Sequence, residues 1–392
     1  MNAQAQGKQN LLIAALCGAA VVVLVALYFS PIWWVSLKAP NYPEEAFPDG
    51  VRIHFHMNGV YNGCKKQENR QIQEDVALDC VHEMDTINHY VGMYPIAAGA
   101  PIERAFSPFL VTLLGVMIVG FAVPNKNARV AILAVGSVVI TLWMFMAFHT
   151  ESGLKYQNAG YIEALVTALD QDISDADDEP EQLSASQALI ARLRASLKES
   201  GVETEEPKDT TSKTVSSKQS LIDNLRITFE KDQERKKSDE AWKGNSAQML
   251  TWHYEKTLGR YFNNPAEIKP MVGTLGAISQ VIFWGLICAM AFLVVGTWLW
   301  RPFTWLLVLV PILLPVFFVI DYAGWLWWFG HNLNEMGAFT VKEFMPTVFG
   351  QGKVAQFSTH SYPYFGFGLM VLLSVVLGVA ALLRRNQTHA HG

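Results

Sequence analysis

The sequence predicts a mainly α-helical membrane protein: a six-span transmembrane helix bundle with periplasmic loops and a charged helical insertion. The chain of 392 residues is 51% hydrophobic and 12% aromatic, which is too apolar for an ordinary soluble domain. Its apolar residues are concentrated in six long runs. A run of about twenty apolar residues is long enough to cross a bilayer as a helix.

The first run, residues 11–30, continues into Pro31-Ile-Trp-Trp34 with no small-residue cleavage site. We therefore interpret it as an uncleaved anchor with an interfacial aromatic belt, not as a removed signal peptide. Two helical hairpins and a closing helix supply the other spans. These are residues 105–123 with 129–148, 274–300 with 302–328, and 364–383.

Basic residues predict the orientation. Those that flank the spans all fall on one side of the predicted bundle, which the positive-inside rule makes cytoplasmic. Both termini are then cytoplasmic, and in a bacterium the large loops face the periplasm from the inner membrane. The flanking residues are Lys8, Lys126, Arg129, Arg301, Arg384 and Arg385. The predicted segments are 1–30 (anchor), 31–104 (first loop), 105–148 (hairpin), 149–273 (charged insertion), 274–328 (hairpin), 329–363 (third loop) and 364–392 (last span and tail).

The net charge of −5 gives no indication of nucleic-acid binding. We expect the spans to contact membrane lipid. We also expect a periplasmic or membrane protein partner, because residues 151–270 form a charged insertion with 22 acidic and 16 basic residues. Such a helical insertion usually binds a partner or caps a site. We expect His253 to be an exposed helix residue. Helices are predicted at 163–178, 184–197 and 220–261, the last broken near Gly244, with a flexible linker at 201–217.

One thiol, two imidazoles and two thioethers lie close together at the end of the first loop. Soft sulfur ligands beside imidazole suit copper or a related soft metal. If residues 87–93 are helical, two of the ligands share one helix face. The alternative is a helix cap in which the histidine bonds to backbone and the methionines fill gaps. The residues are Cys80, His82, Met84, His89 and Met93.

The segment 51–57 alternates between apolar and polar residues, which predicts a strand. Its His54 and His56 point the same way and form either a chelating pair or a solvated strand face. Asn58-Gly59 and Asn62-Gly63 are turn signals. Cys64 and Cys80 form a disulfide if the loop faces an oxidising compartment, or else both are thiolate ligands. Cys17 and Cys288 lie in apolar runs and are expected to be inert.

Further polar residues lie where spans end at the predicted outer face. Histidines there are expected to converge with His89, their backbones fixed by asparagine and glycine neighbours. Asp321 near the outer end of a span is a functional candidate, and pairing with a nearby Arg or Lys is the alternative. The remaining candidates at this level are His149, His331, His360, Asn88 and Asn332.

None of the 10 histidines lies inside a predicted span. Membrane-embedded haem b needs axial histidines within its helices, so this class is not favoured. Pro311 and Pro315 could kink the fifth span, but no charge near the membrane midplane accompanies them, so transport is not favoured either. The sequence contains no phosphate loop, nucleophile–base set or metalloprotease motif.

Three phrases resemble uncharacterised multispan membrane proteins encoded beside nitrous oxide reductase and its copper-assembly factors in bacteria. They are Leu37-x-Ala-Pro-x-Tyr-Pro43, Asn88-His-Tyr-x-Gly-Met93, and Gly330-His-Asn-Leu333 with the segment that ends at Ser361 and Pro363. The first phrase has asparagine where we expect glutamine. The resemblance covers the first and last thirds of the chain, not 151–270, and implies a periplasm-facing role in copper handling or electron supply.

Three hypotheses follow. The first is an accessory protein or subunit that binds copper through His89 and Met93, with His331 or His360 completing the shell, and supports a periplasmic copper enzyme such as nitrous oxide reductase. The second is a membrane subunit of a metal-dependent oxidoreductase, with histidines near Asp321, which a substrate cavity would favour. The third is a structural protein in which these residues tie loops together and the insertion docks a partner.

Overall fold

The computed structural model describes residues 3–65, 79–174, 210–354 and 356–389. It confirms a mainly helical bundle with apolar membrane-spanning helices. Five helices are long and apolar enough to cross a membrane, and a bent pair makes a sixth span when counted as one. The five are α1 (Ala3–Tyr28), α3 (Pro101–Ala122), α4 (Lys126–His149), α9 (Pro265–Leu299) and α12 (Phe365–His389); the pair is α10 (Phe303–Ile312) with α11 (Leu314–His331).

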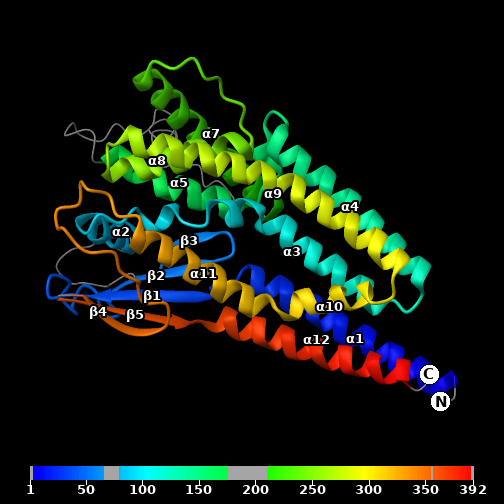
Figure 1. Cartoon of the computed structure of the whole chain (residues 1–392). Coiled ribbons are helices and arrows are strands. Elements are labelled where there is room, and N and C mark those ends of the chain that lie inside the picture. Colours follow the sequence, from blue (N-terminus) through cyan, green and yellow to red (C-terminus); the bar gives the residue numbers. More distant parts are fainter. Residues whose placement is uncertain (1–2, 66–78, 175–209, 355, 390–392) are drawn as a thin grey trace, which may run out of the picture.

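Both chain termini lie at one end of the bundle (Figure 1). The basic side chains at this end bind the backbone ends of neighbouring spans. Arg129 donates to Val123 O at 2.8 Å and to Thr304 Oγ1 at 3.1 Å, and Arg384 donates to Ala122 O at 3.1 Å. These contacts confirm that the connectors and the tail share one end. We call the opposite end, where the long loops gather, the loop end.

The fifth span in chain order is broken at Leu313, where α10 and α11 meet at 57°. Pro315 lies in the first turn of α11, and Pro311 precedes the break. A proline ring lacks the N–H donor and clashes with the preceding turn, so the α-helix cannot continue through both prolines unbent. The sequence predicted a kink here. Its consequence is that α11 leaves α10 and runs beside the loop-end sheet (Figure 1).

The first and third loops combine into one antiparallel sheet with strand order β3-β2-β1-β5-β4. Only β2 (Val51–His56) was predicted. It pairs antiparallel with β3 (Gly59–Asn62), and Met57 and Asn58 form the turn between the two strands. The central pair joins β1, which was not predicted as a strand, to β5 near the C-terminus. The remaining bounds are β1 (Trp33–Lys38), β4 (Gly350–Val354) and β5 (Phe357–Pro363).

Ser361 on β5 is fully buried and fixes α11 to this sheet. Its Oγ accepts a hydrogen bond from Trp33 Nε1 at 2.8 Å and lies 3.2 Å from the Tyr322 hydroxyl of α11. The rings of Phe318 and Phe367 pack on Trp33. A buried polar hub of this kind is costly when incomplete, so it holds the sheet and α11 in one arrangement.

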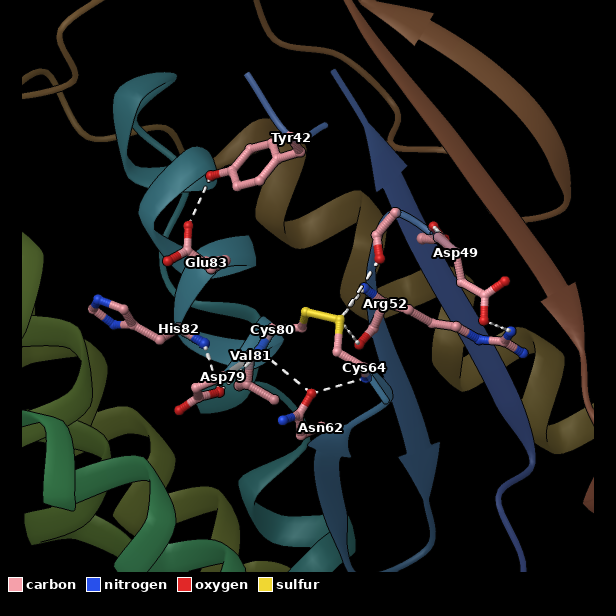
Figure 2. The surroundings of a disulfide bond; sticks show 12 residues. Tyr42, Asp49, Arg52, Asn62, Cys64, Asp79, Cys80, Val81, His82 and Glu83 are labelled. Atoms are coloured by element: carbon pink, nitrogen blue, oxygen red, sulfur yellow. Dashed lines mark hydrogen bonds and ion pairs between the residues drawn. A yellow bond between two sulfur atoms is a disulfide. The ribbon is translucent and has the colours of Figure 1, made fainter. Parts of the chain in front are cut away.

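Helix α2 (Cys80–Tyr90) is joined to the sheet by the Cys64–Cys80 disulfide (Figure 2). Of the two alternatives for these cysteines, the structure therefore has the disulfide. Asn62 Oδ1 accepts hydrogen bonds from the backbone N–H groups of both cysteines, at 2.9 and 3.4 Å. Asp79 caps the helix through bonds from Val81 N and His82 N. Disulfide, strand end and helix start thus form one unit.

The charged insertion packs closely on the spans. Its helices are α5 (Ala159–Ser174), α7 (Thr210–Lys236) and α8 (Ser246–Tyr261). Buried Gln157 donates to Ala105 O of α3 and to Ser246 Oγ, both at 3.0 Å. The predicted break near Gly244, which has φ of +62°, is confirmed. The linker prediction was wrong for residues 210–217, which begin α7, and the predicted helix 184–197 lies outside the described residues. Two short 3-10 helices, Ile96–Ala98 and Gly153–Tyr156, complete the fold.

The expectation that His253 is exposed was wrong. Its side chain lies between α8 and α5, 3% exposed, with Nε2 3.2 Å from Leu165 O and Nδ1 3.3 Å from Thr257 Oγ1. The insertion has an apolar core of its own, so the inner face of α8 is buried. Burial, with a smaller effect of the nearby Arg104 charge, lowers the pKa of His253 to about 3.

This burial predicts a pH effect on stability. Between the ordinary histidine pKa of 6.5 and about 3, the unfolded chain binds a proton at His253 that the folded chain excludes. Wild type should therefore lose about 1.4 kcal/mol of unfolding free energy per pH unit below 6.5, relative to His253→Gln. Denaturant unfolding in detergent at pH values on both sides of 6.5 measures the difference. Parallel pH profiles of the two proteins would contradict the burial of a neutral His253.

Candidate functional site

The Asn88–Met93 phrase forms the end of α2 and joins the first loop to the third. Asn88 O accepts from Val91 N and Met93 N, and Gly92 has φ of +80°, a left-handed conformation that ends helices. Gly92 O accepts from Asn334 N at 2.8 Å. A Cβ at Gly92 would lie 2.5 Å from Asn334 O, so only glycine fits this approach. The first and third loops therefore meet at this point.

The imidazoles from these loops have separate surroundings. His89 Nδ1 lies 2.6 Å from Thr86 O, and its ring stacks on Tyr261 with centroids 5.1 Å apart. The His331 ring stacks on Trp327, with Nδ1 2.8 Å from Trp327 O. His360 is paired in register with Ser36 and Gln351 in the sheet.

The other predicted metal ligands are also dispersed. Met84 and Met93 are buried in two different apolar clusters. His54 stacks on Tyr364, and His149 packs against Phe283 of α9. Within the described residues no three side chains of the His, Cys, Asp and Glu types come close enough to share a metal ion. Asn332 caps α11, with its Nδ2 donating to Trp328 O at 2.8 Å. The copper site stays a prediction.

A cavity in the described structure lies where α11 departs from the bundle. This cavity of about 290 Å³ is bounded by α3, α11, the first residues of α12 and the β2–β3 hairpin. Its lining is mostly apolar. Leu110 of α3 and Phe317 of α11 line the cavity and are 36% and 49% exposed. Asp321, which also lines the cavity, is exposed as well. The cavity therefore opens sideways between α3 and α11, toward the region that lipid occupies around the spans.

Two carboxyl groups face each other in this cavity. Asp321 of α11 lies within interaction range of Glu103, in the first turn of α3. Glu103 Oε1 accepts from Trp325 Nε1 at 3.2 Å, and Glu103 Oε2 is buried with no N–H or hydroxyl donor among the described residues. Paired carboxylates repel unless they share a proton or bind a cation. The alternative considered for Asp321, an ion pair with Arg or Lys, is not what the described residues form.

Arg104 and His56 add two further polar groups to the lining. Arg104 is 5% exposed, and its Nε donates to Ala100 O at 3.3 Å. No carboxylate in the described ranges forms an ion pair with it. His56 lies at the end of β2 with its ring 4.7 Å from Tyr61. Burial, and to a lesser extent the neighbouring His54, lowers the pKa of His56 to about 4, so its imidazole is neutral at physiological pH.

Of these four lining residues, the sequence analysis named Asp321 and His56 as candidates and did not name Glu103 and Arg104. The apolar run was taken to begin at Ala105, and α3 begins at Pro101. Adjacent ionisable residues at the start of a span are a functional signal by themselves. Comparison of this chain with protein-family models, curated proteins and solved structures gives no match.

The carboxyl pair predicts that Asp321→Asn stabilises the ligand-free protein. The substitution removes a like-charge contact, and a gain on the order of 2 °C in melting temperature is expected. Thermal unfolding of delipidated protein in detergent measures it. Glu335→Gln, an exposed carboxylate just beyond α11, serves as the matched control. A lower melting temperature for Asp321→Asn would show that Asp321 has a favourable partner in the ligand-free state.

Proposed function

We propose that this membrane protein binds one membrane amphiphile in the cavity between α3 and α11. The observation that carries the proposal is a mostly apolar cavity that opens sideways between spans and ends in charged groups. Apolar pockets with a few convergent polar groups are the usual form of small-molecule sites. A ligand that enters from lipid would place its chains along Phe317 and Leu110 and its head at Glu103, Asp321 and Arg104.

We place this site at the periplasmic surface of a bacterial inner membrane. The Cys64–Cys80 disulfide at the loop end favours an oxidising compartment on that side. The basic residues at the opposite end favour the cytoplasm there. The cavity then lies at the level of the outer leaflet's head groups.

The cavity proposal predicts that a bulky residue at its mouth displaces the ligand. Leu110→Trp fills the opening on α3, whereas Val119→Trp places the same ring on an exposed position of α3 that does not line the cavity. Native mass spectrometry of protein from mixed phosphatidylethanolamine and phosphatidylglycerol micelles should show one retained lipid in wild type and Val119→Trp. Retention should fall about tenfold or more in Leu110→Trp. Equal retention in all three proteins, or none in wild type, would contradict the proposal.

Copper handling in support of a periplasmic copper enzyme such as nitrous oxide reductase is the second candidate. The observation in its favour is the arrangement around Tyr261. Its hydroxyl lies 3.3 Å from His82 Nδ1, and its ring stacks on His89. Two imidazoles from one helix thus flank a single phenol, and imidazole suits copper. A partner docking on the insertion 151–270 belongs to this candidate.

Metal analysis of the detergent-purified protein after incubation with copper tests this second candidate. If His82 and His89 hold the ion, His82→Ala and His89→Ala should each lower copper affinity by more than about tenfold, because each removes a ligand. His331→Ala is the control, since its ring lies on Trp327, away from Tyr261. Copper binding that survives in both variants, or that is absent in wild type, would exclude this pair as the site.

A further inference from the structure

The cavity contains both signs of charge, and their arrangement restricts the head group that it accepts. Glu103 and Asp321 supply two carboxyl groups, and Arg104 supplies one guanidinium. A purely anionic head would meet the carboxyl pair, and a purely cationic head would meet Arg104. Arg104 and Glu103 Oε2 are buried, so a mismatched charge beside either group is expensive, because a charge away from water needs a partner.

The carboxyl pair is suited to a primary ammonium group. Glu103 Oε2 is buried, no N–H or hydroxyl group of the described residues donates to it, and the Asp321 carboxyl interacts with Glu103 through charge and hydrogen bonding. An ammonium group has three N–H donors and can bond both carboxylates at once while relieving their repulsion. A quaternary choline has the charge without the N–H donors.

Arg104 is suited to a phosphate. Its side chain is 5% exposed, and the only hydrogen bond it forms with the described residues is from Nε to Ala100 O. The other N–H groups of a guanidinium form a planar fork that matches two phosphate oxygens. The neighbouring imidazole of His56 is uncharged and does not compete for the anion.

Building on the proposed function of this cavity, we propose that its ligand is a phospholipid with a phosphoethanolamine head. The ammonium lies between Glu103 and Asp321, the phosphate lies against Arg104, and the acyl chains leave between α3 and α11 past Leu110 and Phe317. Recognition requires both ends of the molecule. The head matches the charges, and the chains cover the apolar lining.

The test compares lipids that differ only in the head. Delipidated full-length protein is mixed with equal amounts of phosphatidylethanolamine, phosphatidylcholine and phosphatidylglycerol of the same acyl chains, and native mass spectrometry counts the adducts. We expect wild type and Glu335→Gln to prefer phosphatidylethanolamine about tenfold or more over each of the others. In Asp321→Asn this preference should fall below about threefold while a lipid is still retained. Arg104→Lys keeps the charge and should keep phosphate binding, with weaker affinity because the fork is lost.

The outcomes separate the two proposals. Equal retention of phosphatidylglycerol or phosphatidylcholine by wild type would overturn the phosphoethanolamine assignment and leave the amphiphile site standing. An unchanged preference in Asp321→Asn would also overturn the assignment. Soluble glycerophosphoethanolamine should compete poorly, and competition equal to that of the lipid would show that a free head group, not a membrane lipid, is bound. Absence of every adduct from wild type would overturn the site and the assignment together.

Discussion

The pairing of β1 with β5 is the contact on which the loop end depends. It joins Trp33–Lys38 to Ser358–Pro363 through six register pairs, although more than 300 residues separate the two strands. Through it the first and third loops form one sheet, and α1 and α12, which precede and follow these strands, lie side by side. Trp33 and Ser361 then fix Tyr322 of α11. The pairing thus supports α11 near the break, and Trp325 and Trp328 contact Glu103 and Tyr94 further along the helix.

This support also makes the break in the span possible. A helix bent at Leu313 inside lipid would leave backbone groups unsatisfied unless neighbouring structure covers them. Here the sheet and the aromatic cluster around Phe318 hold the second half of the span away from α3. The cavity lies between α11 and α3, and Asp321 lies on α11, the second half of the broken span. The sheet therefore supports α11, the break directs α11 along the sheet, and Asp321 on α11 comes to face Glu103 as a result.

Hydropathy and local pattern predicted the helical class, the spans, strand β2, the break near Gly244 and the disulfide, because each depends on neighbouring residues. Strands β1, β4 and β5 were missed. The pairing of β1 with β5 joins residues more than 300 positions apart, which local sequence pattern does not reveal. His253 was misassigned because the polar composition of the insertion hid its apolar core. Of the cavity, Asp321 and His56 were found, whereas Glu103 and Arg104 fell just outside the span as drawn from hydropathy.

The segments Asn88–Met93 and Gly330–Leu333 lie at the junction of the first and third loops and do not line the cavity. Asn88 and Gly92 end α2, Asn334 bonds to Gly92, and Ser361 fixes α11. At Gly330 a Cβ would lie 1.9 Å from Phe344 O, so this position also demands glycine. The chain between Met93 and Pro101 leads directly from this junction to the start of α3, where Glu103 lies. Asp321 is held from the other side through Tyr322. Glu103 thus follows the loop junction in the chain, whereas Asp321 follows the contacts of its neighbour Tyr322 with the sheet, so two separate sets of contacts position the two carboxyl groups.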